Sequence, residues 1–260
     1  MKKVLFNTAS KEELKAKLFA EPFKRITLSF YKYVIISDTQ QFRDWLYEAF
    51  ENLQVLGRTY VATEGINAQI SLPDYNFDAF RKFIDSHEYL KNVPFKIAVE
   101  DDGKPFYKLI VRIREKVVAD GLNDDTFDVT NVGRHLTARE FNEAMEQPGT
   151  IVVDLRNHYE SEVGHFVNAI LPDTDTFRET LPVAIDQLQD AKDKKVLLYC
   201  TGGIRCEKAV LYMQEKGFGQ VYQLDGGILR YFEEVGGAHY RGDCFVFDRR
   251  VALTAGELQI

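Results

Sequence analysis

The sequence has few cysteines, no long hydrophobic run and no excess of positive charge. Three cysteines among 260 residues are too few for a disulfide scaffold and favour a reducing compartment. No apolar run approaches the roughly 20 residues that cross a membrane. Charged residues follow closely on Met1, so we expect no secretion signal. These absences predict a cytoplasmic protein with no membrane association.

The formal net charge of −7 argues against strong non-specific binding to nucleic acid. The charge is uneven, because residues 1–120 carry +2 and residues 121–260 carry −9. If the protein contacts an acidic polymer, the first part of the chain is the better candidate. A charge of +2 is equally typical of an ordinary domain.

A length of 260 residues fits two domains. In the first, residues 1–118, extended and helical patterns alternate in the order β-α-β-β-α-β. This order predicts a ferredoxin-like α+β domain. Extended segments are expected at residues 25–36, 58–63, 66–72, 94–99 and 107–113. Helices are expected after Asp38-Thr39 and after Pro73-Asp74.

Residues 119–135 are polar and rich in turn formers, and we interpret them as a linker. Residues 136–237 then alternate short apolar strands with helices, which is typical of an α/β domain with a mainly parallel sheet. A capping box of Thr137 and Glu140 indicates its first helix. Strands are expected at residues 151–155, 195–199 and 221–224, and helices at residues 184–188 and 209–215. Residues 238–260 form a C-terminal extension.

The most informative stretch begins at Cys200 and ends at Arg205, and we name it the Cys200 loop. Cys200 directly follows an apolar strand and precedes a helix, so it lies where α/β sheets hold their sites. Two glycines let the backbone curl and turn N–H groups toward the sulfur. The residues that contribute these groups are Thr201, Gly202, Gly203, Ile204 and Arg205.

A ring of N–H groups at a helix start stabilises an anion, so it lowers the pKa of the Cys200 thiol and favours the reactive thiolate. It would equally hold a persulfide or an oxyanion. The competing interpretation is a buried cysteine that only packs in the core. The strand, the glycines and the helix start around Cys200 argue against that interpretation.

This stretch resembles the active-site loop of rhodanese-type sulfurtransferases. Supporting motifs occur in the same order: Asp154-Leu155-Arg156, Gly164-His165-Phe166-Val167-Asn168-Ala169-Ile170 and Leu224-Asp225-Gly226-Gly227-Ile228. Val167 and Asn168 depart from the family pattern. Four residues separate Cys200 from Arg205, whereas rhodanese-fold phosphatases have one more, which favours sulfur chemistry over phosphate chemistry. The resemblance implies a rhodanese α/β domain.

The whole chain resembles the narrower tRNA uridine hydroxylase family TrhO. The matching segments include Ala62–Ala68, Asp154–Asn157, Pro172–Glu179, Cys200–Ala209 and Gly242–Asp248. The resemblance implies an acylphosphatase-like N-terminal domain joined to the rhodanese domain. It further implies that tRNA is the partner, that wobble uridine becomes 5-hydroxyuridine, that molecular oxygen is the co-substrate and that Cys200 is essential.

Two arginines near the loop have open roles. Arg205 can pair with Asp154 or Glu207, or it can bind a substrate phosphate through its planar guanidinium. Arg156 is expected at the strand end facing the loop, where it contacts substrate or only orders the turn through a salt bridge.

The two other cysteines also have alternative interpretations. Cys206 is a candidate thiol for resolving a persulfide or sulfenate on Cys200. The helix can equally turn the Cys206 sulfur into the core. Cys244 lies in an alternating pattern typical of a strand, and we expect it to pack in the core.

Basic residues alternate with apolar ones near the end of the first domain, at Lys108, Arg112 and Arg114. One face of this strand can follow RNA phosphates, or it is an ordinary solvated face. The five histidines show no metal-binding spacing, and no nucleotide-binding glycine motif occurs, so we identify no metal and no cofactor from the sequence.

Three classes of function therefore compete. The first is a tRNA hydroxylase, and the second is a sulfurtransferase that carries a persulfide on Cys200. The third is a non-enzymatic binding module, which does not need a cysteine at the focus of a ring of N–H groups. The additional N-terminal domain favours the hydroxylase, because a simple sulfur carrier does not require it.

Overall fold

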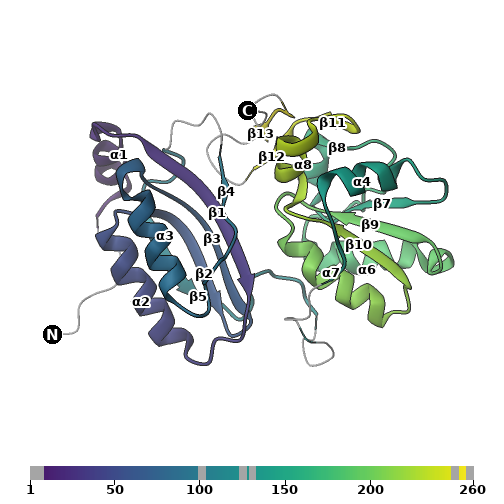
Figure 1. The fold of residues 1–260 in the computed structure, drawn as a ribbon, viewed down its shortest axis with the longest axis horizontal. Coiled ribbons are helices and arrows are strands. Elements are labelled where there is room, and N and C mark those ends of the chain that lie inside the picture. The colour runs from purple at the N-terminus through teal and green to yellow at the C-terminus, as the bar shows by residue number, and fades with distance from the viewer. Residues whose placement is uncertain (1–8, 99–103, 123–127, 129–132, 247–251, 256–260) are drawn as a thin grey trace. The chain divides into compact units, whose positions relative to one another are not determined.

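The computed structural model describes residues 9–98, 104–122, 128, 133–246 and 252–255 (Figure 1). The chain divides into two units, whose main parts are Met1–Val117 and Val118–Phe247. The second unit begins at Val118, one residue before the predicted linker of residues 119–135. None of the described helices is both long and apolar enough to cross a membrane.

The first unit contains one five-stranded sheet in the order β4-β1-β3-β2-β5. Its strands are β1 (Arg25–Tyr33), β2 (Leu56–Ala62), β3 (Gly65–Pro73), β4 (Lys96–Ile97) and β5 (Leu109–Ile113). Strands β4, β1, β3 and β2 pair antiparallel, and β5 pairs parallel to β2. With α2 (Thr39–Asn52) and α3 (Phe77–Ser86), this arrangement confirms the ferredoxin-like fold, to which β5 adds a fifth strand.

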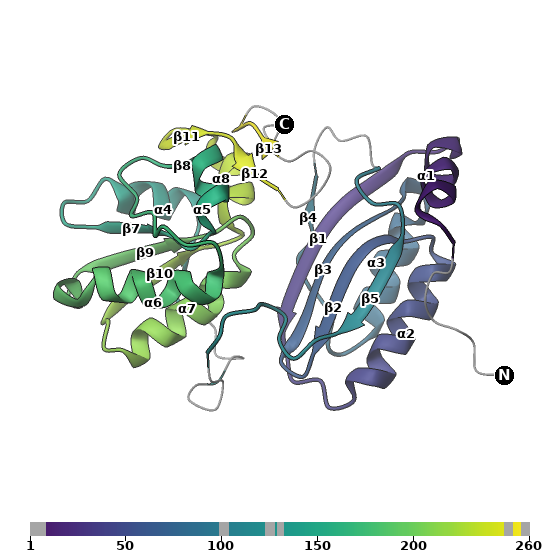
Figure 2. The ribbon, with the colours of Figure 1, turned by 180° about the vertical axis from the view of Figure 1, so that it is seen from behind.

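Helices α2 and α3 lie against one face of this sheet (Figures 1 and 2). Alternate strand residues, such as Leu28 and Phe30 of β1, point toward the helices and are buried with Phe50 and Phe80. The side chain of Asp38 accepts a hydrogen bond from the N–H of Gln41, as expected for the first residue of a helix cap.

Several boundaries differ from the sequence prediction. Strand β1 ends at Tyr33 rather than at residue 36, and β4 contains only two residues. The 3-10 turn η1 (Asp74–Asn76) precedes α3. Helix α1 (Lys11–Ala20) was not predicted, because only Leu18 of this polar helix is buried and no apolar periodicity marks it. Its capping box, Ser10 with Glu13, was the available signal.

The second unit contains a four-stranded parallel sheet in the order β6-β10-β9-β7. Its strands are β6 (His135–Leu136), β7 (Ile151–Asp154), β9 (Lys195–Tyr199) and β10 (Gln220–Leu224). Helices α4 (Ala138–Met145) and α8 (Gly227–Val235) pack together on one face, and α6 (Phe177–Gln187) and α7 (Ile204–Glu215) pack on the other (Figure 1). The predicted parallel α/β sheet is confirmed.

Helix α6 is longer than the predicted residues 184–188. Pro182 lies inside it, and a proline usually marks a helix boundary, so the pattern indicated only the second half. The 3-10 turn η3 (Gln189–Ala191) follows. The elements that were not predicted are α5 (His158–Val163), β8 (Gly164–Phe166), β11 (Tyr240–Gly242), β13 (Ala252–Leu253), the two-residue strand β6 and the helix α8.

Strands β8 and β11 pair with each other, and β12 (Cys244–Phe245) pairs with β13 (Ala252–Leu253). Cys244 is buried in β12, as the alternating pattern predicted. The first residues of the second unit are held on α7 by a buried ion pair, in which Nζ of Lys208 lies 2.5 Å from a carboxylate oxygen of Asp120. A charge pair this deep anchors the segment, since removing either partner leaves the other charge buried.

Candidate active site

Cys200 immediately follows β9 and lies four residues before the first full turn of α7. Its side chain is buried, with 1% of the residue exposed. The N–H of Gly203 donates to the Cys200 sulfur across 3.1 Å, and the N–H of Arg205 is a second donor. Gly203 adopts a φ of 96°, in the left-handed region that favours glycine. The predicted ring of donors therefore contains at least these two amides, and glycine permits its curvature.

The surroundings of Cys200 change the acidity of its thiol. Burial by itself raises the pKa, but the hydrogen bond from Cys206, the Arg205 guanidinium and the two backbone N–H groups together outweigh burial and lower it to about 5. Cys200 is therefore a thiolate at neutral pH, as expected for a reactive cysteine.

Cys206 lies in the first turn of α7 and is fully buried. Burial and the hydrogen bond to Cys200 raise the pKa of Cys206 well above its ordinary value. It therefore stays protonated and donates its S–H to the thiolate. The two sulfurs are neighbours but are not joined, because both cysteines are free.

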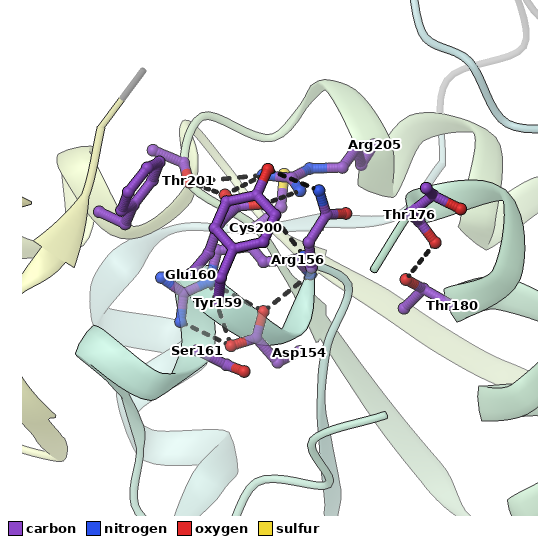
Figure 3. Close-up of polar contacts among 12 residues, drawn as sticks. Asp154, Arg156, Tyr159, Glu160, Ser161, Thr176, Thr180, Cys200, Thr201 and Arg205 are labelled. Carbon is purple, nitrogen blue, oxygen red and sulfur yellow. Dashed lines mark hydrogen bonds and ion pairs between the residues drawn. The ribbon is translucent and has the colours of Figure 1, made fainter. Parts of the chain in front are cut away.

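Arg205 forms a bidentate ion pair with Glu160 of α5, rather than with the predicted Asp154 or Glu207 (Figure 3). Its two terminal nitrogens lie 2.6 and 2.8 Å from the two carboxylate oxygens. Burial opposes ionisation of Glu160, but the adjacent Arg205 guanidinium keeps its pKa below the ordinary value. The hydroxyl of Thr201 also donates to Glu160, across 3.3 Å. Glu160 therefore holds both ends of the Cys200 loop.

Sequence reasoning missed Glu160. A usable signal existed, because Asn157 and Glu160 have the spacing of a capping box, and the N–H of Asn157 donates to the Glu160 carboxylate across 3.0 Å. That pattern predicts a helix start. It does not predict the ion pair with Arg205, which lies 45 residues further along the chain.

Asp154 and Arg156 form a second buried pair beneath the loop (Figure 3). A terminal nitrogen of Arg156 lies 2.6 Å from the Asp154 carboxylate and also donates to the carbonyl of Gly164. Only 1% of Arg156 is exposed. The geometry favours the interpretation in which Arg156 orders the turn after β7 over one in which it binds a substrate phosphate.

A second glycine turn supports the Cys200 loop from the other side. The N–H groups of Ile228 and Leu229, at the start of α8, donate to the carbonyls of Cys200 and Thr201 across 3.1 and 3.2 Å. A side chain on Gly227 would place its Cβ 2.5 Å from the carbonyl oxygen of Cys200. The backbone of the loop occupies the space that a Cβ at position 227 would need, so this position requires glycine.

The basic residues predicted to contact RNA belong to the first unit and are not part of the Cys200 loop. Arg112 is within β5, and Lys108 directly precedes that strand. Arg114 follows the strand, and its N–H donates to the carbonyl of Val61. Over the described ranges, no three His, Cys, Asp or Glu side chains gather into a group that could hold a metal ion.

A cysteine on a glycine loop, between a parallel strand and a helix, is the arrangement expected of a rhodanese-like domain. Residues 137–234 match the sequence model of that domain, and residues 25–117 match the UPF0176 acylphosphatase like domain. A solved rhodanese-like domain protein from Staphylococcus aureus is 24% identical and aligns with a TM-score of 0.33, covering 39% of this chain and 94% of its own.

Curated relatives match nearly the entire chain. The tRNA uridine(34) hydroxylase of Leptospira interrogans is 54% identical over 98% of this chain and 71% of its own length. The tRNA uridine(34) hydroxylase of Pectobacterium carotovorum is 51% identical over 95% of this chain and 71% of its own length. The chain belongs to the tRNA uridine(34) hydroxylase family.

Proposed function

We propose that this protein is an oxidoreductase that hydroxylates uridine 34, the wobble uridine of tRNA, to 5-hydroxyuridine in the cytoplasm. The observation that carries the proposal is an identity of 51–54% with tRNA uridine(34) hydroxylases over 95–98% of the chain. Identity at this level extends through both domains, so it covers more than the rhodanese fold. Molecular oxygen is the proposed co-substrate, and Cys200 is the proposed catalytic residue.

The chemistry of Cys200 supports this assignment. With a pKa of about 5, the thiol is roughly 99% ionised at pH 7. A buried thiolate held by two N–H groups is available as a nucleophile without a separate general base. The same donors would stabilise negative charge on a group bound to the sulfur.

The neighbouring residues position this sulfur. The positively charged guanidinium of Arg205 stabilises the Cys200 thiolate, and an ion pair with Glu160 holds this guanidinium in place. Asp154 and Arg156 order the turn that leads into α5, which carries Glu160. We assign these four residues to positioning, and Cys200 to the reaction.

Nucleoside mass spectrometry of tRNA tests the proposal directly. Cells that lack the protein are complemented with wild type, with Cys200→Ala or with Cys244→Ala as a matched buried cysteine. We expect 5-hydroxyuridine and its derivatives to return with wild type and Cys244→Ala but not with Cys200→Ala. Hydroxylation that is independent of the protein contradicts the proposed function, and full activity of Cys200→Ala contradicts the role of Cys200.

A separate isotope-labelling experiment tests where the oxygen atom of the product hydroxyl comes from. Purified protein and unmodified tRNA are incubated under isotopically labelled oxygen gas in unlabelled water, with the cell extract that supports the reaction. We expect the label in the hydroxyl group of the nucleoside. A product that takes its oxygen from water would exclude molecular oxygen as the source.

A second candidate is a sulfurtransferase, which the Cys200 loop itself favours because its N–H groups would also hold a persulfide. In that reaction, the thiolate attacks the outer sulfur of thiosulfate, a sulfur–sulfur bond forms on Cys200 and sulfite leaves. Intact mass measurement after incubation with thiosulfate would then show one added sulfur atom, absent in Cys200→Ala. Efficient transfer to cyanide without any tRNA hydroxylation would favour this candidate over the hydroxylase.

A further inference from the structure

One face of the sheet in the first unit combines tyrosine rings with cations. We define the open face as the side of the five strands opposite α2 and α3 (Figure 2). The strand registers place Tyr31 opposite Asn67, Asn67 opposite Tyr60, and Tyr60 opposite Arg112. Paired residues of neighbouring strands project to the same side, so these four side chains form one row across β1, β3, β2 and β5.

The alternation of burial identifies this row as the open face. The adjacent residues Phe30, Ala68 and Val111 point the other way and are buried with the helices. Tyr31 and Tyr60 are half-buried, whereas Arg112 is exposed. The tyrosine rings are therefore held by their neighbours and still present part of their surface.

Each of the two tyrosines has a cation over one face of its ring. Nζ of Lys96 lies 4.6 Å from the centre of the Tyr31 ring, and the guanidinium of Arg114 lies 5.2 Å from the centre of the Tyr60 ring. The next row along the sheet adds Arg58, which is paired with Gln69. The five strands, all of which are described, place no Asp or Glu on this face. The face is thus basic within a protein whose net charge is −7.

This combination has a specific chemical complement. A sheet face with aromatic rings suits unpaired bases, which stack on the rings, and the surrounding cations attract the phosphates that link them. The amide of Gln69 can hydrogen-bond a base edge, whereas the amide nitrogen of Asn67 donates to the carbonyl of Val117 across 3.3 Å and so fixes the centre of the row. A base-paired stem hides its bases and does not use such rings. An acidic peptide would meet the cations but would leave the tyrosines without a matching partner.

We infer that the open face binds unpaired nucleotides of the tRNA, with bases stacked on Tyr31 and Tyr60 and phosphates near Lys96, Arg112 and Arg114. The inference rests on the proposed function, since it takes tRNA as the substrate, and it adds a surface of the first unit that selects single-stranded RNA. The predicted Lys108 is adjacent to this surface, directly before β5.

Fluorescence anisotropy with a labelled anticodon stem–loop of uridine-34 tRNA measures this binding in the full chain. We expect Tyr31→Ala with Tyr60→Ala to weaken affinity by roughly 5- to 150-fold for each stacked base that is lost. Tyr31→Phe with Tyr60→Phe retains the rings and should bind within about threefold of wild type. Matched controls outside the face are Tyr75→Ala and Lys82→Gln, which should leave affinity unchanged.

The charge contribution has its own readout, which does not depend on the packing of the tyrosines. Arg112→Gln with Arg114→Gln removes two exposed cations. The slope of log affinity against log salt should become shallower by about 1.4, since each phosphate contact to a single strand contributes about 0.7. A fully paired duplex of the same length is the comparison ligand, and it should bind more weakly to wild type.

Unchanged affinity and salt slope in both sets of variants overturn the inference. Equal binding of the duplex and the stem–loop also overturns it, because the face would then not select unpaired nucleotides. An altered oligomeric state with unaltered RNA affinity in the tyrosine variants overturns it too, because the face would then bind protein. Failure of the proposed function looks different: the nucleoside analysis would show no dependence on the protein, whatever the open face binds. Cys200→Ala should bind the stem–loop as wild type does.

Discussion

Removing the S–H group of Cys206 should raise the pKa of Cys200 while leaving the cysteine in place. The Cys206 thiol is buried in α7 and stays protonated, so it donates to the Cys200 thiolate. Cys206→Ala deletes this donor and retains the two backbone N–H groups and Arg205. Cys206→Ser is the matched control, because its hydroxyl can donate from the same position.

The size of the effect follows from the strength of one hydrogen bond to a charged group. Such bonds contribute about 1.5–3 kcal/mol, and a thiol is a weak donor, so about 1.5 kcal/mol applies. One pKa unit corresponds to about 1.4 kcal/mol. The pKa of Cys200 should therefore rise from about 5 to about 6. At pH 5.5, the thiolate fraction would fall from roughly three quarters to roughly one quarter, whereas near pH 7.5 it would hardly change.

The rate of alkylation by iodoacetamide as a function of pH reports this fraction. Burial raises the pKa of Cys244 to about 12, and Cys206 is also shifted upward, so Cys200 dominates the profile in the acidic and neutral range. Hydroxylation should follow the same profile at low pH. An alkylation profile of Cys206→Ala that overlays wild type would refute the reasoning.

The same variants separate the two roles of Cys206. If Cys206 acts only as a donor, hydroxylation by both variants persists near pH 7.5. If it resolves an oxidised Cys200, both variants lose turnover at every pH, since neither alanine nor serine can form a disulfide.

The depressed pKa of Cys200 also couples folding to pH. The folded state prefers the thiolate, so its contribution to stability is fully present above the pKa of the unfolded thiol and is lost as pH falls through about 5. Chemical denaturation of Cys200→Ala across this range should show a smaller decline in the free energy of unfolding than wild type shows. An identical pH dependence of stability in both proteins would contradict the coupling.

Three further predictions concern buried contacts of the second unit. Glu160→Gln leaves the charge of Arg205 buried without its partner and should cost roughly 3–5 kcal/mol of stability in chemical denaturation; a loss below about 1 kcal/mol would argue against the pair. Gly227→Ala should abolish hydroxylation, because an alanine is strained at a φ of 70° and its Cβ would clash with the backbone of the Cys200 loop. Normal turnover would show that the loop can shift to accept the Cβ. Lys208→Met leaves the Asp120 carboxylate buried without its partner and should lower the stability of the protein by a similar 3–5 kcal/mol. Adding Asp120→Leu removes that unpaired charge, so the double variant should be more stable in thermal unfolding than Lys208→Met. Losses of stability that simply add in the double variant would contradict the coupling between the two residues.

Local patterns were sufficient for much of the fold. The apolar strand at residues 195–199 and the capping box of Thr137 and Glu140 occur as predicted, because both depend on residues adjacent in sequence. The polar helix α1 was missed for the same reason, since without an apolar stripe a local pattern carries little information. The proline in α6 concealed half of that helix.

The sequence by itself determined the local geometry of the Cys200 loop. A cysteine between an apolar strand and a helix, followed by two glycines, can curl its backbone around the sulfur, and this depends on a few consecutive residues. Only the tertiary structure decided what supports that loop and where the open face lies. Glu160 reaches Arg205 across 45 residues, and Tyr31, Tyr60 and Arg112 meet only through strand pairing. Such contacts depend on which helices and strands pack together. That packing is determined by burial of the apolar core of each unit, and not by the polar residues that come into contact as a result.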